Sequence, residues 1–381
     1  MRATTEPDDR PPFAFVAIGS FSGINDQVLS RLADGFAELR PDHLDVGAWA
    51  RGNRGVLAAN LGRVLARSGP AAFTDRERLW GAFYRSPYLD RRLRGELRRR
   101  AGDRPHAFTL QTQSLFDASL PGVPHFVYTD HTGLSNAYYP DFDPADAPDE
   151  RWLAREREIY GRAARVFTMS RHVSRSVVEH YGIDPDRVRC VYAGSNVAAA
   201  PDPASPRPAG KRILFVGREW ERKGGPDLLA AFRLVRERHP DATLVVVGCT
   251  PPLDEEATTV LGELPAEQVS AQYRQATVFC MPTLREPFGI AFVEALTHGV
   301  PVVATAIGAV PDVVAHGETG LLTQPHDVQG LAEALSLLLG DPQRCRAFGD
   351  RGRRFVEGRY TWGRVGGALV GHIREVLVGG S

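Results

Sequence analysis

Lysine is almost absent from this sequence. Of its 46 basic residues, only Lys211 and Lys223 are lysines, and the others are all arginines. A lysine ammonium is a compact point charge, whereas the arginine guanidinium is a planar fork, so the two groups are not interchangeable at a binding site. A lysine retained in so arginine-rich a chain is therefore a candidate for a site that needs an ammonium group.

Net charge is absent as well, because 46 acidic residues balance the 46 basic ones. This balance gives no global signal for a nucleic acid or a membrane, and we predict no nucleic-acid partner. Hydrophobic residues make up 43% of the chain and charged residues 24%, as is typical of soluble globular proteins. With 381 residues, the chain is long enough for two domains with a sizeable core each.

Long apolar runs and closely spaced cysteines are also missing. Residues 1–12 are polar and lack the apolar core of a signal peptide, so we predict a flexible tail. No apolar run approaches the length of a transmembrane helix. The four scattered cysteines lack metal-ligand spacing and resemble small buried side chains of a reducing compartment. These features predict a cytoplasmic protein.

Apolar, strand-like runs alternate with helical patterns along the chain, which predicts an α/β fold with parallel sheets. Residues 13–195 form one such unit and residues 211–359 a second, while the alanine- and proline-rich residues 196–210 predict a semi-rigid linker. Residues 360–377 carry an apolar stripe at helical spacing, which predicts a final helix. The predicted strands are residues 13–18, 107–110, 126–128, 166–169, 188–191, 212–216, 243–248, 276–281 and 301–304.

Two glutamates, Glu286 and Glu294, lie eight residues apart where the strand 276–281 gives way to a predicted helix. With Pro287 in the first helical turn, eight residues of helix would rise roughly 12 Å. Carboxylates at that separation can accept hydrogen bonds from hydroxyl groups at opposite ends of one elongated ligand. A helix with a solvated acid at each end is an equally good interpretation of the spacing alone.

Backbone amides between the two glutamates are predicted to bind an anion. Unpaired N–H groups point out of a helix N-terminus, where the helix dipole also favours negative charge, so phosphate is the natural ligand. A ligand with phosphates between two hydroxylated rings is a nucleotide sugar. The amides concerned are those of Phe288, Gly289 and Ile290.

A glycine-containing loop follows the first strand of each unit. Gly19 and Gly23 in the first loop allow a ligand to approach the backbone, although many such turns only pack a helix on a strand. In the second loop, Gly217 precedes Arg218 and Lys223, a guanidinium and an ammonium suited to phosphate oxygens. A charged surface loop is the alternative, but the scarcity of lysine favours the phosphate site.

Polar residues that directly follow strands of an open α/β sheet lie at the carboxyl ends, where ligands bind. His131 follows the strand 126–128 and is a site candidate, although a histidine that merely closes a turn is commoner. We place five residues in the same N-terminal cleft as candidates for acceptor binding: Phe21, Gln111, Gln113, Tyr138 and Tyr139.

Residues 89–100 combine leucines at helical spacing with six arginines. We favour an amphipathic surface helix with a solvated basic face. Contact with anionic lipid, and hence peripheral attachment to the inner membrane face, or contact with an acidic acceptor is the less favoured alternative.

Taken together, these motifs resemble glycosyltransferase family 4. Glu286 and Glu294 match the family's E-x7-E element, in which the first glutamate contacts the transferred sugar and the second the ribose. Gly217, Arg218 and Lys223 are similar to its diphosphate-binding loop.

The resemblance extends to further positions. The segment ending at Leu264 looks like the one whose backbone meets the base, and His131 corresponds to the histidine that approaches the donor sugar. The helix that begins near Tyr360 is similar to the family's last helix. The chain departs from the family pattern in a later turn, where Ala309 and Asp312 replace the usual glycine and glutamate.

The resemblance implies the GT-B fold, with two facing Rossmann-like domains and a last helix that crosses back to the N-terminal one. It implies that residues 13–195 bind the acceptor and residues 211–359 the nucleotide sugar. The implied reaction is a retaining transfer from a nucleoside-diphosphate sugar to a hydroxyl-bearing acceptor, without a metal or another cofactor. A sugar phosphorylase of the same fold and a non-catalytic nucleotide-sugar-binding protein are the alternatives.

Overall fold

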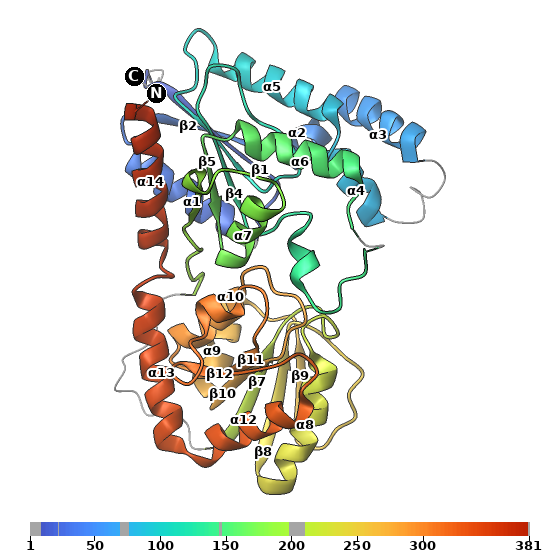
Figure 1. Cartoon of the computed structure of the whole chain (residues 1–381), viewed down its shortest axis with the longest axis vertical. Helices are drawn as coiled ribbons and strands as arrows, with labels where there is room; N and C mark the ends of the chain where they lie inside the picture. Colours follow the sequence, from blue (N-terminus) through green and yellow to red (C-terminus); the bar gives the residue numbers. More distant parts are fainter. Residues whose placement is uncertain (1–8, 22, 69–75, 145–146, 198–209, 380–381) are drawn as a thin grey trace, which may run out of the picture.

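Two parallel sheets, each of six strands, form two α/β domains that lie one above the other (Figure 1). Residues 1–8 of the predicted tail and 198–209 of the predicted linker lie outside the described residues. No helix in the described part of the chain is both long and apolar enough to span a membrane. The computed structural model describes residues 9–21, 23–68, 76–144, 147–197 and 210–379.

The N-terminal sheet has the strand order β2-β1-β3-β4-β5-β6, and all neighbouring strands are parallel. The chain runs from β1 out to β2 and then returns to β3 on the other side of β1, so a crevice is expected where these carboxyl ends diverge. The strands are β1 (Pro12–Ala17), β2 (Arg40–Asp45), β3 (Thr109–Thr112), β4 (His125–Thr129), β5 (Arg165–Thr168) and β6 (Val188–Cys190). The helices are α1 (Ile24–Gly35), α2 (Val46–Gly52), α3 (Arg54–Ser68), α4 (Arg76–Tyr84), α5 (Pro87–Ala101), α6 (Glu150–Arg162) and α7 (Arg171–Glu179).

The C-terminal sheet has the order β12-β11-β10-β7-β8-β9 and reverses between β7 and β10, again with parallel neighbours. The strands are β7 (Lys211–Val216), β8 (Ala242–Val247), β9 (Thr258–Gly262), β10 (Val278–Met281), β11 (Val302–Thr305) and β12 (Gly320–Thr323). The helices are α8 (Gly225–Arg238), α9 (Ala266–Gln275), α10 (Ile290–Thr297), α11 (Val310–Val313), α12 (Val328–Gly340), α13 (Pro342–Glu357) and α14 (Trp362–Gly379).

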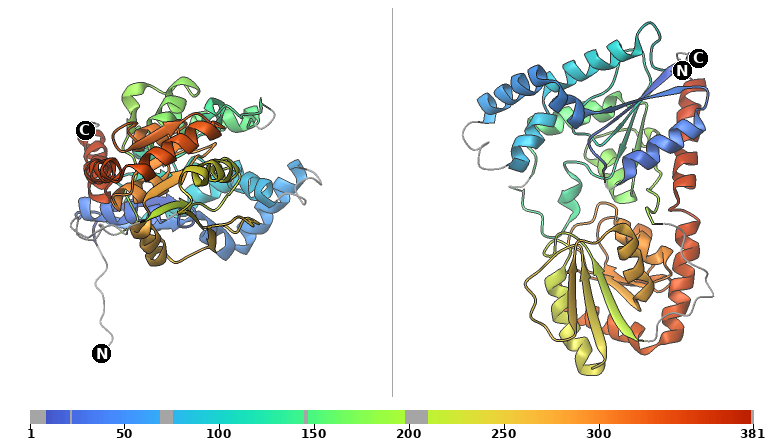
Figure 2. Two further views of the ribbon diagram at one scale, coloured as in Figure 1. Left: turned by 90° about the horizontal axis from the view of Figure 1, so that it is seen from below. Right: turned by 180° about the vertical axis from the view of Figure 1, so that it is seen from behind.

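The last helix, α14, leaves the C-terminal domain and runs alongside the N-terminal one, where it packs against α1 (Figures 1 and 2). Its Arg374 donates a hydrogen bond of 2.7 Å to the carbonyl of Gly35 at the end of α1. At its start, the indole N–H of Trp362 donates to the side-chain oxygen of Asn196 over 3.2 Å. Both ends of the helix are therefore tied to the first half of the chain.

The α/β class and the parallel sheets are confirmed, and the predicted strands are all present. Sequence patterns missed three strands, β2, β9 and β12, which are the edge strands at three of the four sheet margins. An edge strand is partly exposed, so it carries no continuous apolar run. The prediction that β3 ends at Leu110 was wrong, because the strand continues through Gln111 to Thr112.

Candidate active site

A cavity of about 520 Å³ lies between the two domains and is lined by residues from both. Each contribution follows the carboxyl end of a strand: Phe21 follows β1, Asp130 and His131 follow β4, Lys223 follows β7 and Glu286 follows β10. The edges of two parallel sheets thus supply one site, as expected where the strand order of each sheet reverses.

Lys223 and Glu286 form a buried ion pair in this cavity. The Lys223 ammonium donates a hydrogen bond to a carboxylate oxygen of Glu286, and the two side chains are only 13% and 5% exposed. A buried charge needs a partner of opposite sign, and each of these groups provides one for the other. One of the two lysines in the chain is therefore placed beside the first glutamate of the pair.

The loop that carries Lys223 is held close to the end of β10 by Gly224. This glycine has a φ of 74° and forms the N-cap of α8. A Cβ at this position would lie 1.9 Å from the carbonyl oxygen of Pro282, a distance no side chain tolerates. The close approach brings the Lys223 side chain within reach of Glu286.

Glu286 is also fixed through its backbone. Its N–H donates to the hydroxyl oxygen of Tyr139, a residue of the other domain, over 3.1 Å. Its carbonyl accepts the N–H of Ala309 at 2.9 Å. The sequence placed Tyr139 near the N-terminal cleft, but its contact with the Glu286 backbone was not predicted.

The predicted helix start was wrong, because α10 begins at Ile290 and Pro287 precedes it. Gly289, with a φ of 89°, is the N-cap residue, so the chain before it is not helical. Glu286 therefore lies outside the helix, and the 12 Å rise between the two glutamates does not apply. Phe288, Gly289 and Ile290 nevertheless line the cavity, and the α10 N-terminus opens onto it.

Glu294 lies inside α10 and is not among the residues that line the cavity. The hydroxyl of Tyr273 donates to its carboxylate over 3.4 Å. Burial raises the pKa of Glu294 to about 7, so this carboxyl group is poised to lose or gain a proton near neutral pH.

His131 lines the cavity opposite the ion pair. Its Nδ1 lies 2.9 Å from the hydroxyl oxygen of Ser135. Burial, with smaller contributions from His172 and Arg85, lowers the pKa of His131 to about 4. The ring is therefore neutral at pH 7 and offers a hydrogen bond rather than a positive charge.

Asp130 is a cavity residue that the sequence patterns did not single out, although it directly follows β4 as His131 does. Its carboxyl group is buried, and one of its oxygens has no hydrogen-bond partner among the described residues. Burial raises the pKa of Asp130 to about 6, and the negative charge of Glu286 adds to this shift. The rule that polar residues directly after a strand lie at a ligand site identified His131, and it applies equally to Asp130.

Several predicted site residues lie away from the cavity lining. The Arg218 side chain is 84% exposed, and its guanidinium is 3.6 Å from Glu263. Gln111 is buried in β3 and donates to two backbone carbonyls, and the Tyr138 hydroxyl donates to Glu179. Phe21 and Gln113, in contrast, do line the cavity. The other predicted donor residues outside the lining are Gly19, Gly23, Gly217 and Leu264.

Two facing α/β domains with a polar cavity at the carboxyl ends of both sheets define the GT-B class of glycosyltransferase folds. The chain belongs to glycosyltransferase family 4. The model of "Glycosyltransferase Family 4" matches residues 27–199, and that of "Glycosyl transferases group 1" matches residues 202–355.

Curated relatives are similar over part of their length. D-inositol 3-phosphate glycosyltransferase of Corynebacterium glutamicum is 30% identical over 247 residues, which cover 57% of this chain and 59% of the relative. Glycogen synthase of Mycobacterium tuberculosis is 29% identical over 228 residues, which cover 57% of this chain and 54% of the relative. The matches thus span less than two thirds of either relative.

Solved structures share the whole fold at low identity. Sucrose-phosphate synthase from Thermosynechococcus elongatus superimposes with a TM-score of 0.71 at 20% identity, covering 98% of this chain and 100% of that one. Anabaena HepE in complex with UDP gives a TM-score of 0.65 at 15% identity, covering 96% and 100%. These similarities establish the GT-B architecture.

Proposed function

We propose that this protein is a retaining glycosyltransferase. It transfers a sugar from a nucleoside-diphosphate sugar to a hydroxyl group of a small natural product, a glycan or a lipid-linked sugar. The observation that carries the proposal is the buried pair of Lys223 and Glu286 in the cavity between the domains. Membership of glycosyltransferase family 4 and the UDP complex of HepE, which has the same fold, support it.

Lys223 and the first amides of α10 stabilise the leaving diphosphate. As the bond from the anomeric carbon to the phosphate oxygen breaks, negative charge builds on that oxygen, and a fixed ammonium and helix dipole in a cavity lower its energy. Two such groups supply positive potential without a metal ion, so we propose that none takes part. In the described residues, no group of three or more His, Cys, Asp or Glu side chains is arranged to hold one.

The acceptor hydroxyl attacks from the face that the diphosphate leaves. A bond forms from the acceptor oxygen to the anomeric carbon, the bond to the phosphate oxygen breaks, and that phosphate oxygen takes the acceptor proton. Attack and departure on one face retain the configuration of the sugar. Glu286 accepts hydrogen bonds from sugar hydroxyls, and the neutral His131 orients the sugar from the opposite wall.

A variant of the cavity lysine, compared with a variant of the surface lysine as its control, tests the proposal. Lys223→Gln should abolish the rise in melting temperature that a nucleoside diphosphate gives the wild type, because the phosphates lose their ammonium partner. Lys211→Gln, at a surface ion pair of 2.8 Å with Asp241, should keep the full response. A ligand at one hundred times its dissociation constant adds about 2.7 kcal/mol of stability, a shift that thermal melting detects.

The shift is measured from each variant's own melting temperature in ligand-free buffer, because loss of Lys223 leaves Glu286 buried without a partner. The panel of nucleotides and nucleotide sugars is run with and without EDTA, and sugar transfer is measured with the donor that binds. Equal responses in both lysine variants would contradict the role of Lys223. No response to any nucleotide would contradict a nucleotide-sugar donor, and loss of transfer in EDTA would contradict a reaction without a metal ion. Release of sugar 1-phosphate in inorganic phosphate would identify a phosphorylase instead.

A further inference from the structure

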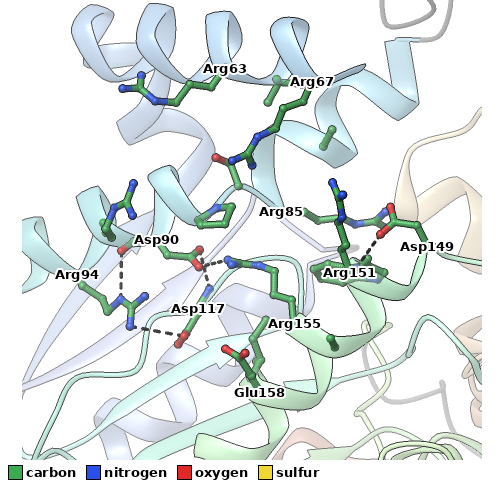
Figure 3. A pocket seen from close by; sticks show the side chains of 18 of the residues that line it. Arg63, Arg67, Arg85, Asp90, Arg94, Asp117, Asp149, Arg151, Arg155 and Glu158 are labelled. Atoms are coloured by element: carbon green, nitrogen blue, oxygen red, sulfur yellow. Dashed lines mark hydrogen bonds and ion pairs between the residues drawn. The ribbon is translucent and has the colours of Figure 1, made fainter. Parts of the chain in front are cut away.

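A second and larger cavity, of about 1070 Å³, lies within the N-terminal domain. Its walls are α3, α4 and α5 on one side and α6 on the other (Figure 3). It shares no lining residue with the cavity that contains Lys223 and Glu286. It is therefore a separate site, of the size that small-molecule ligands occupy.

Arginines dominate this cavity, which we call the arginine pocket. Eight line it, against four carboxylates, so the lining carries four excess positive charges: Arg63, Arg67, Arg85, Arg91, Arg94, Arg151, Arg155 and Arg162 face Asp90, Asp117, Asp149 and Glu158. Figure 3 shows Arg63 and Arg67 on the helix above the pocket and Arg151 and Arg155 on the helix below it.

At the floor of the arginine pocket, arginine side chains form ion pairs with carboxylates that also line the pocket. Arg155 pairs with Asp90, and Arg162 pairs with Asp117. Arg94 lies 3.7 Å from Asp117, and the carboxylate of Asp90 also accepts the backbone N–H of Asp117 at 3.1 Å. This network fixes the base of the pocket and accounts for three of the eight arginines.

The other five arginines make no ion pair in the described part of the chain: Arg63, Arg67, Arg85, Arg91 and Arg151. Two of them are packed on rings instead. The Arg63 guanidinium lies 4.2 Å from the centre of the Tyr88 ring, and that of Arg85 lies 4.5 Å from the Trp152 ring. Ring contacts hold both guanidinium groups in place, and the charge of Arg85 also interacts with Glu156 and Asp149.

A bound anion would relieve the repulsion between the like charges of the arginine pocket. Arg63 and Arg67 are four residues apart on α3, a spacing at which like charges repel and destabilise a helix. Burial lowers the pKa of the Arg85 guanidinium, since its charge is removed from water. Guanidinium forks bind phosphate oxygens in a bidentate manner, and a phosphate ester carries about −1.5 to −2 charges.

A membrane surface does not fit the same arginines. A bilayer contacts the outer face of a helix, and the outward-facing arginines of α5, such as Arg92 and Arg98, do not line the pocket. The arginines without an ion pair instead converge on one concavity from α3, α5, α6 and the turn after α4, which suits a discrete molecule. The excess of four charges corresponds to two phosphate esters.

We propose that the arginine pocket is a second ligand site that binds a small molecule carrying two or more phosphate groups. Arg63, Arg67 and Arg91 on one wall and Arg151 on the other hold the phosphate oxygens, and the paired Asp90 and Asp117 keep the floor rigid. The site is distinct from the cavity that contains Lys223 and Glu286, which we call the donor cavity, and it does not depend on the identity of the transferred sugar.

Binding of tripolyphosphate, measured by isothermal titration calorimetry, tests the site. The triple variant Arg63→Gln/Arg67→Gln/Arg91→Gln should lose at least tenfold in affinity, and Arg151→Gln on the opposite wall should also weaken binding severalfold. Arg92→Gln, the neighbour of Arg91 that faces out of the pocket, is the matched control and should stay within twofold of the wild type. All five side chains are exposed and make no ion pair, so the folds should be preserved, which ligand-free melting verifies.

The Lys223→Gln variant separates this site from the donor cavity. This variant should keep the affinity for tripolyphosphate that the triple variant loses. That expectation does not depend on whether the protein transfers sugar. The proposal is overturned if the triple variant binds tripolyphosphate like the wild type, if only Lys223→Gln loses the binding, or if the wild type binds none. Arginine-dependent binding to phosphatidylglycerol vesicles without any to tripolyphosphate would likewise overturn it, in favour of a membrane surface.

Discussion

At the scale of single residues, Asp130 is a buried acid of the donor cavity without an ion-pair partner among the described residues. Its carboxyl group is buried, one oxygen lacks a hydrogen-bond partner among the described residues, and Glu286 adds a second negative charge nearby. Lys223 is paired with Glu286 and not with Asp130. Folding accordingly makes Asp130 easier to protonate than it is in the unfolded chain.

Asp130→Asn should therefore gain stability relative to the wild type as the pH rises. The pKa of Asp130 is raised to about 6 in the folded state from 3.8, so its contribution is complete below the lower value and is lost as the pH passes the higher one. Between about pH 4.5 and about pH 7.5, the difference in unfolding free energy should shift by about 2 kcal/mol in favour of the variant.

Urea unfolding at the two pH values measures this shift. Asp26→Asn, on the exposed surface of α1, is the control and should show no such trend. An Asp130→Asn difference that is constant with pH would mean that the carboxyl group is ionised throughout the range.

At the scale of secondary-structure elements, the position of α8 depends on the turn that precedes it. Gly224 caps the helix with a positive φ and lies against the backbone of Pro282, at the exit of β10. Two strands that are neighbours in the sheet thereby place their loops in contact, and Lys223 with Glu286 occupies that contact.

Gly224→Ala should be strongly destabilising. A left-handed backbone costs an alanine about 1 kcal/mol, and its Cβ would also collide with a backbone carbonyl that cannot move independently of β10. Gly182→Ala is the matched control, because Gly182 has a similar φ of 67° but nothing within 4 Å of an added Cβ. We expect the unfolding free energy of Gly224→Ala to fall by clearly more than that of Gly182→Ala, and equal losses would exclude the collision.

At the scale of the whole molecule, four polar contacts join the domains around the cavity. Besides the bond from Glu286 to Tyr139, the hydroxyl of Ser170 donates to the carbonyl of Pro287 at 2.9 Å. The N–H of Arg171 donates to Asp312 at 2.7 Å, so the residue that departs from the family pattern serves as a contact between domains. Asp141 lies 3.4 Å from Arg285. These contacts fix the two domains against each other around the cavity.

Tyr139→Phe should loosen this closed arrangement. The Glu286 N–H would remain buried without an acceptor, which costs about 1 to 3 kcal/mol and favours separation of the domains. Faster hydrogen exchange across residues 285–290 and a larger radius of gyration in solution scattering would report the opening. Tyr138→Phe removes a hydroxyl that bonds to Glu179 within the N-terminal domain and should change neither measurement. Identical behaviour of the two variants would show that Tyr139 does not hold the domains together.

Local patterns in the sequence were sufficient for the α/β class, the interior strands and the two residues of the buried pair. Interior strands are recognised by their continuous apolar runs. Lys223 was identified by the rarity of lysine, and Glu286 by its position after a strand and its spacing from Glu294. The start of α10 could not be derived in this way, because Pro287 suits a helix, but the left-handed N-cap Gly289 delays the helix to Ile290, three residues after Pro287.

Only the tertiary structure decided which charges share a cavity. Residues 89–100 do form the amphipathic helix that their spacing predicts, with Leu89, Leu93 and Leu97 buried. Whether its arginines face water or a common pocket depends on α3 and α6, which are distant in the sequence and pack across from α5. Likewise, only the packing of the two domains brings the Tyr139 hydroxyl to the backbone of Glu286. Periodicity reports which face of an element is buried, whereas the partners of the other face follow from long-range packing.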